Sequence, residues 1–516
     1  MKKIRLMFVA ISLLLISWFI TPTNVQASTN NHVLLVYDSE NTATGAAKKI
    51  DTLQRALTSM NLQVKTVDQS KYKKGELNKH YLGVITMINW RELGLLNQKF
   101  ISDRAKFSGI KLHIGQNLSQ SEIKELGGGV QKLYRQQFSL KNNDNEQLLP
   151  FINTMTIVNK TEKAQQIGTL VTQQSNQQNY PFGIINEKAG YLPSFNTSGL
   201  SLMLEIQLVG QLFHRVGTYQ PLLTFTKVTP YSDLRMIDEL SRYCNKNGIS
   251  FAISTTSVSQ NTNLKAFNRF TATLRNVESR SGIIFLNAPE VSSTNNSGTL
   301  LSQQFSTYIV TLSQHQVFPV GVSADGFWNQ DQVLRTNFLQ YANHWLMLPS
   351  QSQPNFVKQD NDAKAVQESY FGMSMSSLKK MSNTGDIQFS IPTALTIPLP
   401  NTDKDLATVK RDLQQNNFAW YDAVSDGLTT KIETPSSLLE YKYGNYYANG
   451  KHEEVQISNS SLNKQFGDNK PKATLSRYFK VQGHIFMTFF IIVTIILLVF
   501  IYLGQKVYWN RMRRKK

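Results

Sequence analysis

Eight polar and aromatic side chains stand close to the positions where predicted strands end, and they are of types that bind sugars. Aromatic rings stack on the apolar faces of sugars, and Asn or Asp side chains hydrogen-bond to hydroxyl groups. The candidate glycan-binding residues are Thr226, Lys227, Asn287, Asp325, Trp328, Trp420, Tyr421 and Asp422. The pattern predicts a sugar-binding cleft, with the alternative that Trp328 and Trp420 are only large core or rim residues.

Two of these residues, Asp325 and Asp422, suggest a second chemistry. Two carboxyl groups on either side of a glycosidic bond can act as general acid and base. Nothing in the sequence places these two side chains opposite each other, so hydrolysis is kept as an alternative. No Gly-x-Ser-x-Gly segment, the signature of a serine hydrolase elbow, occurs in the chain.

Metal-binding side chains are few and scattered along the sequence. Cys244 is the single cysteine, which excludes an internal disulfide and any cysteine-based zinc or iron–sulfur site. The eight His residues form no His-x-x-x-His pair, and no Asp-Asp pair occurs. We therefore expect no metal and no cofactor. Residues 39–45 follow a predicted strand and are expected to form an ordinary turn, with phosphate binding as an alternative that one Gly and no Lys do not favour.

The elements that must position these residues are strands alternating with helices. With 516 residues, of which 41% are apolar, the chain has room for two or three domains with sizeable cores. Residues 31–135 alternate buried-strand runs with helical spacing, which predicts a flavodoxin-like parallel-sheet domain. Residues 149–215 are predicted to form a small β-rich insert followed by a connecting helix.

From residue 220 to 425 a strand and a helix recur about every 30 residues. Six or so such units imply a closed or nearly closed (β/α) barrel. The fold class predicted for the whole chain is therefore α/β. Residues 443–478, polar and rich in Asn, Lys and Ser, are predicted to form a stalk.

The segment LLTFTKVTPYSDLRMIDELSRYCNKNGISFAIS, together with SGIIFLNAPEV, resembles polysaccharide deacetylase-like barrels. The similarity is nearest to an uncharacterised membrane-anchored bacterial branch of that superfamily, and it covers roughly residues 220–425. It depends more on the order of elements than on identities.

The resemblance implies a metal site and, at the same time, its loss. In the family one Asp and two His hold a divalent metal, and a neighbouring Asp is the general base. Here Thr226 and Lys227 stand at the paired-Asp positions, and Asn287 and Val291 stand at the His positions. Because these side chains cannot hold a catalytic Zn²⁺, we expect a barrel that has lost the family's reaction.

Both ends of the chain carry targeting features. Residues 1–27 have the basic start, apolar stretch and small cleavage residues of a secretory signal, with an uncleaved anchor as the alternative. Residues 485–503 are uncharged and long enough to cross a membrane, and residues 504–516 form a basic tail. The positive-inside bias predicts a cytoplasmic tail and an extracellular bulk.

Nearly half of the net charge of +19 lies at these ends. Three basic residues of the signal and six of the tail leave about +10 for the exterior part. This mild basic bias suits anionic lipids or an anionic wall polymer. Without a basic patch interleaved with aromatic residues, nucleic-acid binding is not expected.

Three functional hypotheses follow. The first is a non-catalytic, membrane-tethered extracellular protein of a Gram-positive bacterium that binds a cell-surface or secreted polysaccharide beside the biosynthetic machinery. The second is an active carbohydrate hydrolase or deacetylase with a relocated site. The third is a structural partner whose transmembrane helix contacts a membrane glycosyltransferase or synthase.

Overall fold

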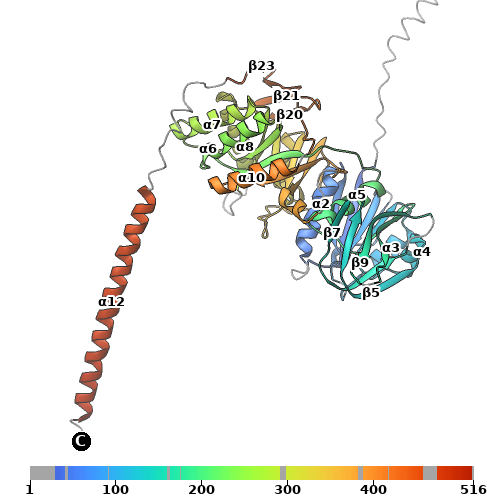
Figure 1. Cartoon of the computed structure of the whole chain (residues 1–516), viewed down its shortest axis with the longest axis horizontal. Helices are drawn as coiled ribbons and strands as arrows, with labels where there is room; N and C mark the ends of the chain where they lie inside the picture. Colours follow the sequence, from blue (N-terminus) through green and yellow to red (C-terminus); the bar gives the residue numbers. More distant parts are fainter. Residues whose placement is uncertain are drawn as a thin grey trace, which may run out of the picture. The chain divides into compact units, whose positions relative to one another are not determined.

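The computed structural model describes residues 30–40, 45–78, 80–90, 92–159, 163–174, 176–290, 298–381, 387–416, 418–456 and 474–513. The chain divides into two compact units, residues 1–457 and 458–516. The two largest sheets of the first unit are a mixed sheet and a closed parallel barrel, which Figure 1 shows in blue to cyan and in green to orange. The predicted signal at residues 1–27 lies outside the described residues.

Four parallel strands form one half of the mixed sheet, in the order β2-β1-β3-β4. They are β1 (His32–Tyr37), β2 (Gln63–Asp68), β3 (Gly83–Met87) and β4 (Ile110–Ile114). Three helices connect them or follow them: α2 (Ala46–Ser59), α3 (Gln98–Lys106) and α4 (Gln120–Leu126). The apolar runs of the four strands are buried, as expected for parallel strands covered on both faces. This part agrees with the α/β pattern predicted for residues 31–135.

The strands expected to form a separate β insert instead extend the same sheet. Strand β11 (Ala189–Leu192) pairs in parallel with β4, and β10 (Asn179–Asn186) and β9 (Gln165–Thr172) follow it. Strands β6 (Phe138–Asn142) and β7 (Asn145–Leu148) complete this side, while β5 (Val130–Gln136) pairs with β8 (Ile152–Val158) in a two-stranded sheet. The physical reason is the free edge of β4, which offers unpaired backbone groups to the next strands.

A strand from far along the chain covers the other edge of this sheet. Strand β17 (Asp362–Ala363) pairs antiparallel with β2, with Ala363 opposite Val64. The amide of Thr66 also donates to the carbonyl of Asn361 at 2.8 Å. The mixed sheet therefore has ten strands, and one of them comes from the region predicted to belong only to the barrel.

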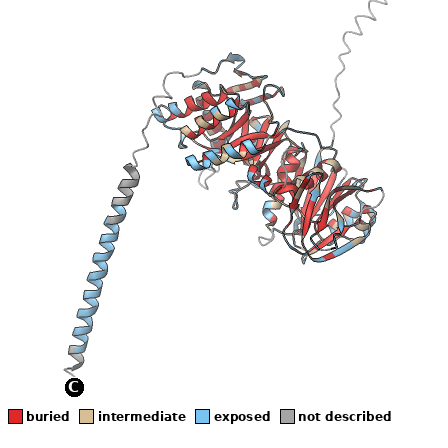
Figure 2. Ribbon diagram, in the orientation of Figure 1, coloured by how far each residue is buried: buried red, intermediate tan, exposed pale blue. Residues whose placement is uncertain are grey.

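Seven parallel strands close into the barrel, in the order β12-β13-β14-β15-β16-β18-β19. They are β12 (Leu222–Val228), β13 (Phe251–Thr255), β14 (Gly282–Asn287), β15 (Gly321–Asp325), β16 (His344–Leu348), β18 (Glu368–Ser374) and β19 (Thr393–Pro398). The helices that connect barrel strands include α6 (Leu234–Lys246), α7 (Lys265–Glu278), α8 (Gly298–Gln314) and α9 (Gln332–Asn337), and α10 (Asp403–Gln415) follows the last strand. Helix α5 (Gly199–Leu212) precedes the barrel and packs on the mixed sheet. Figure 2 shows the barrel strands as buried. The predicted barrel is confirmed as a closed one.

Some local details of the barrel differ from the alternation of strands and helices in the sequence. The run Phe418 to Tyr421, which that alternation predicts as a last strand, forms no strand, and β16 and β18 were not predicted at all. The sequence also predicts Ser232 as the N-cap of helix α6. The helix instead begins after Asp233, whose Oδ1 accepts a hydrogen bond from the amide of Arg235. The runs at residues 344–348 and 418–421 both contain aromatic residues, which favour strands. Sequence propensity therefore does not distinguish them, and the closure of the barrel decides which run pairs as a strand.

Part of the predicted stalk is folded. Four antiparallel strands form a separate small sheet: β20 (Thr429–Thr434), β21 (Ser437–Lys442), β22 (Asn445–Ala448) and β23 (Lys451–Glu453). Tyr446 is buried there and its ring lies 5.5 Å from that of Phe318. An apolar anchor thus holds residues 445–453 on the first unit, although their composition is polar. Residues 457–473 lie outside the described part.

The second unit contains one long helix, α12 (Thr474–Arg513). Within it, Ile485–Trp509 is long and apolar enough to cross a membrane once. Figure 2 shows the span Ile485–Trp509 as exposed. The apolar side chains therefore have no protein covering among the described residues, as expected for a membrane span.

Candidate functional site

The predicted strand-end residues lie at two opposite ends of the barrel. Thr226, Asn287 and Asp325 lie at the carboxyl ends of β12, β14 and β15. Tyr421 instead lies at the amino end, where its amide donates to the carbonyl of Pro221, the residue before β12, at 3.0 Å. At about 3.3 Å per residue, β12 separates the two ends by roughly 20 Å. The eight residues do not form one cleft.

This separation also removes the predicted acid–base pair. Asp422 follows Tyr421 at the amino end, and its Oδ1 accepts hydrogen bonds from the amides of Val424 and Ser425. Its carboxylate therefore stabilises a turn. Asp325, at the carboxyl end, has no access to it.

Neither tryptophan offers a free ring at the carboxyl end. Trp328 is 3% exposed and its ring lies 5.1 Å from that of Phe338. Trp420 is half-buried and packs on Phe418 at 5.2 Å, close to Tyr421. The alternative that they are core or rim residues describes both of them.

Uncharged polar side chains occupy the carboxyl half of the barrel interior. The hydroxyls of Ser254 and Ser323 lie 2.8 Å apart, and Ser323 donates to Oδ1 of Asn287 at 3.1 Å. Because β13 and β15 are not neighbours in the sheet, the first of these bonds crosses the interior. The strand pairings and the alternation of side chains give the same inward orientation to three threonines, Thr224, Thr226 and Thr396.

Lys227 does not join this polar interior. It has a φ of 61°, at the point where the register between β12 and β13 shifts, and its side chain is exposed. A bulge of this kind turns a side chain out of the ladder. Lys227, a predicted site residue, therefore lies on the surface. Val291, the fourth position implied by the resemblance, lies outside the described residues.

The described residues also offer no metal-binding cluster. No group of three or more His, Cys, Asp or Glu side chains in that part of the chain is placed to hold a metal ion together. At the strand ends themselves, Thr226 and Asn287 supply only a hydroxyl and an amide. This donor set lacks the imidazole and carboxylate groups that zinc prefers.

Asp325 stands beside a second carboxylate at the carboxyl end of the barrel. Burial, together with the negative charge of Asp51 on α2, raises the pKa of Asp325 to about 6. Asp51 is held by the Nε of Arg55 at 2.9 Å and by the hydroxyl of Ser350. Arg55 in turn donates to the carbonyl of Gly372 on β18 at 2.8 Å. The α/β part thus contributes a helix to the carboxyl rim of the barrel.

A hydrogen-bonded cluster at the amino end of the barrel was not expected from the sequence. His344 on β16 contacts Glu368 on β18 at 3.1 Å, and the ring of Tyr370 lies 6.0 Å from that of Tyr421. Burial would raise the pKa of Glu368, but the hydrogen bond and charge of His344 lower it. In parallel barrels the amino face supports stability and the carboxyl face supports function, so we assign this cluster a structural role.

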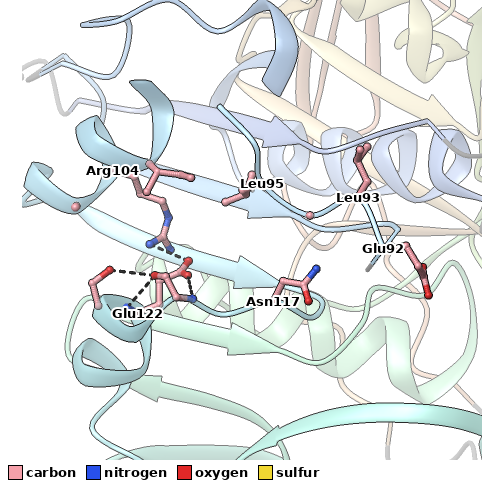
Figure 3. Close-up of a pocket in the computed structure, with 11 residues that line it drawn as sticks. Glu92, Leu93, Leu95, Arg104, Asn117 and Glu122 are labelled. Atoms are coloured by element: carbon pink, nitrogen blue, oxygen red, sulfur yellow. Dashed lines mark hydrogen bonds and ion pairs between the residues drawn. The ribbon is translucent and has the colours of Figure 1, made fainter. Parts of the chain in front are cut away.

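The α/β part has a cavity of its own, about 310 Å³ in volume, next to the carboxyl ends of β3 and β4 (Figure 3). Open α/β sheets bind ligands at this edge. The loop after β3, helix α3 and the start of α4 line it. Its lining residues are Glu92, Leu93, Gly94, Leu95, Ile101, Arg104, Ala105, Asn117, Ser119, Ser121 and Glu122.

A buried ion-pair cluster forms one wall of this cavity. Oε1 of Glu122 lies 2.9 Å from Nη1 of Arg104 and 2.7 Å from Nδ1 of His113. Burial would raise the pKa of Glu122, but the charges of His113 and Arg104 and the amide of Ser119 hold it well below the usual range. Sequence reasoning missed this cluster because the three residues stand on three different elements without a motif. A capping pattern, Ser119 followed by Glu122 three residues later, was the only local signal.

Comparisons with known proteins do not identify a family for this chain. No family model matches the sequence, and no curated protein matches it either.

Proposed function

We propose that this chain is a membrane-anchored extracellular protein whose barrel binds a cell-surface or secreted polysaccharide without catalysing a reaction. The observation that carries the proposal is the uncharged polar interior at the carboxyl ends of the barrel strands, formed by Ser254, Ser323 and Asn287. Hydroxyl and amide groups both donate and accept hydrogen bonds, which suits the hydroxyl groups of sugars.

The same interior supports binding more than chemistry. A deacetylase-like reaction needs a metal-bound water and a general base. Thr226 and Asn287 offer neither, and Lys227 is turned to the surface. The resemblance to polysaccharide deacetylases suggests the class of ligand, while the residues present suggest that the barrel retains binding alone.

The long helix α12 supports a position at the membrane. Its span, Ile485–Trp509, followed by a basic tail, favours an anchor with a cytoplasmic end. A protein held there beside a membrane glycosyltransferase or synthase would meet the polymer as it leaves the enzyme. We propose this accessory role in cell-surface or exopolysaccharide biosynthesis of a Gram-positive bacterium.

Retention of the full-length, detergent-solubilised protein on immobilised wall and secreted polysaccharides tests the proposal. We expect retention, and we expect Asn287→Ala to weaken it about tenfold, since a lost hydrogen bond to a ligand costs roughly 1–1.5 kcal/mol. Ser425→Ala, an exposed change at the amino end of the barrel, is the matched control and should bind as the wild type does. A wild-type protein that binds none of these polymers would contradict the proposal.

Asp325 supports a second candidate, an active carbohydrate hydrolase. Its pKa of about 6 and its neighbour Asp51 make a carboxyl pair in which one member can hold a proton near neutral pH. For this candidate we expect purified protein to release acetate or reducing sugar, with the release abolished by Asp325→Asn and unchanged by Asp422→Asn. No release from the wild type would leave the binding function in place and exclude the hydrolase.

A further inference from the structure

The cavity beside β3 and β4 contains a guanidinium group with unused donors. Arg104 is 6% exposed, its Nε donates to the hydroxyl of Thr86 at 2.9 Å, and its Nη1 pairs with Glu122. Its Nη2 has no hydrogen-bond partner among the described residues. Figure 3 shows the guanidinium directed toward Glu122, at one end of the row of lining residues. A buried cation of this kind offers hydrogen-bond donors to whatever occupies the cavity.

The cluster behind Arg104 carries more positive than negative charge. His113 is 1% exposed, its Nδ1 faces the carboxylate of Glu122 at 2.7 Å, and its Nε2 faces the carbonyl of Gln116 at 2.9 Å. Both of these partners only accept hydrogen bonds, so both ring nitrogens must donate, which requires the doubly protonated ring. One carboxylate then stands against two cations.

The neighbouring acidic groups do not correct this imbalance. Glu92 is exposed, and Figure 3 shows it at the opposite end of the lining from Arg104. Glu125 is paired with Lys111 at 2.5 Å. An uncompensated charge inside a protein is unfavourable, so an anion bound at Nη2 of Arg104 would neutralise the cluster.

The rest of the lining selects among anions. Leu93, Leu95 and Ile101 form an apolar wall, while the hydroxyls of Ser119 and Ser121 lie beside the charged end. A phosphate ion requires several donors around its oxygens, whereas this cavity offers one unused guanidinium nitrogen beside a carbon surface. A carboxylate attached to a ring with hydroxyl groups matches both the guanidinium nitrogen and the carbon surface. The cavity volume of about 310 Å³ is within the range of small-ligand sites.

We propose that this cavity is a second ligand site, which binds a sugar acid with its carboxylate on Nη2 of Arg104. The choice of a sugar, rather than another small organic carboxylate, rests on the proposed polysaccharide function. The site itself is independent of the barrel, because its residues all come from the α/β part.

Calorimetric titration of the full-length protein in detergent with D-glucuronate tests the proposal, with D-glucose and inorganic phosphate as further probes. We expect one glucuronate site per chain, no binding of glucose, and weaker binding of phosphate. Ala105→Phe places a ring in the cavity from an exposed helix position, and it should weaken glucuronate binding at least tenfold. Ser102→Phe, exposed on the same helix but outside the lining, is the matched control and should bind normally.

Several outcomes would overturn the inference. Absence of glucuronate binding, equal binding of glucose, tighter binding of phosphate, or unchanged binding in Ala105→Phe would each do so. A normal unfolding midpoint for Ala105→Phe would establish that the variant is folded. Failure of the polysaccharide-retention experiment, with glucuronate binding intact, would instead remove the proposed barrel function and leave this site in place.

Discussion

Glu205 is a buried carboxyl group that the binding proposals do not use. It lies on α5, fully buried, and accepts hydrogen bonds from the backbone amide and the side chain of Asn196 at 2.8 and 2.6 Å. Burial raises its pKa to about 8, and the charge of Lys49 offsets this only in part. The group therefore holds a proton at neutral pH in the folded protein.

This raised pKa predicts a stability that falls as pH rises. An unfolded Glu has a pKa of about 4.3, so between pH 4.3 and 8 the folded protein retains a proton that the unfolded chain releases. The free energy of unfolding should decrease over that range. We expect Glu205→Gln to reduce this slope and to raise the thermal midpoint at pH 8, with little change at pH 5, while Glu278 and Asp325, whose pKa values burial also raises, keep part of the slope. The measurement is thermal unfolding followed by circular dichroism from pH 5 to 8.

The exposed Glu187→Gln is the matched control for this prediction. It should leave the pH dependence as it is in the wild type. A Glu205→Gln variant with the same slope as the wild type would show that the carboxyl group is ionised, and paired, in the folded protein.

The residue types in the sequence predicted that the carboxyl end of the barrel is polar, but they did not predict which residues lie there. Thr226, Asn287 and Asp325 lie there as predicted. Trp420 and Asp422 do not, because residues 418–421 form no strand and lie at the opposite end. The carboxylate beside Asp325 is Asp51, about 270 positions earlier in the sequence. A pairing over such a separation is decided by tertiary packing alone.

Among the elements, strands with continuous apolar runs were predicted with near-correct bounds. Residues 32–37, 110–114 and 222–228 are such runs, and each is buried on both sides as a parallel strand requires. Strands β16 and β18 were missed because short runs such as HWLML fit either a helix or a strand, and only closure of the barrel distinguishes them. The β insert was misassigned because spacing does not show which edge a strand will join.

Helix α12 allows the anchoring and assembly hypotheses to be separated. If α12 serves only to hold the protein at the membrane, replacement of residues 485–503 by leucines should preserve membrane fractionation and polysaccharide retention. Leucine supplies the apolar length that a span requires. Sedimentation after alkaline extraction, together with the retention assay, measures both properties.

A different result would change the assignment of this helix. If the leucine helix remains in the membrane but polymer production in cells is lost, the side chains of the native helix must contact a partner. That outcome would favour the structural hypothesis over the binding one. A truncation before residue 474 is the control, and it should be found in the soluble fraction.

For the whole molecule, the single cysteine makes the predicted orientation measurable. Cys244 is fully buried, and burial raises its pKa to about 12, so its thiol stays protonated and unreactive. Tyr231→Cys introduces a thiol at an 88% exposed position in the first unit. We expect a membrane-impermeant maleimide to label this variant in intact cells, because the bulk of the chain is predicted to be extracellular.

A cysteine added after Lys516 is the complementary variant. It should react only after the membrane is permeabilised, since the basic tail is predicted to be cytoplasmic. The wild type should remain unlabelled in both conditions. Labelling of the tail in intact cells would invert the predicted orientation.

The pairing of β17 with β2 has a consequence for how the chain reaches its final shape. A chain that leaves a translocation channel amino end first releases β2 about 300 residues before Ala363. Until then the backbone N–H and C=O groups on the outer edge of β2 are unpaired, and a strand of another molecule, including a second nascent copy, can pair with them. Strand β12 likewise pairs with β19, residues 393–398, so the barrel cannot close until those residues have emerged. Under the proposed extracellular location, we expect export of this protein to depend on a holding chaperone at the exit of the channel.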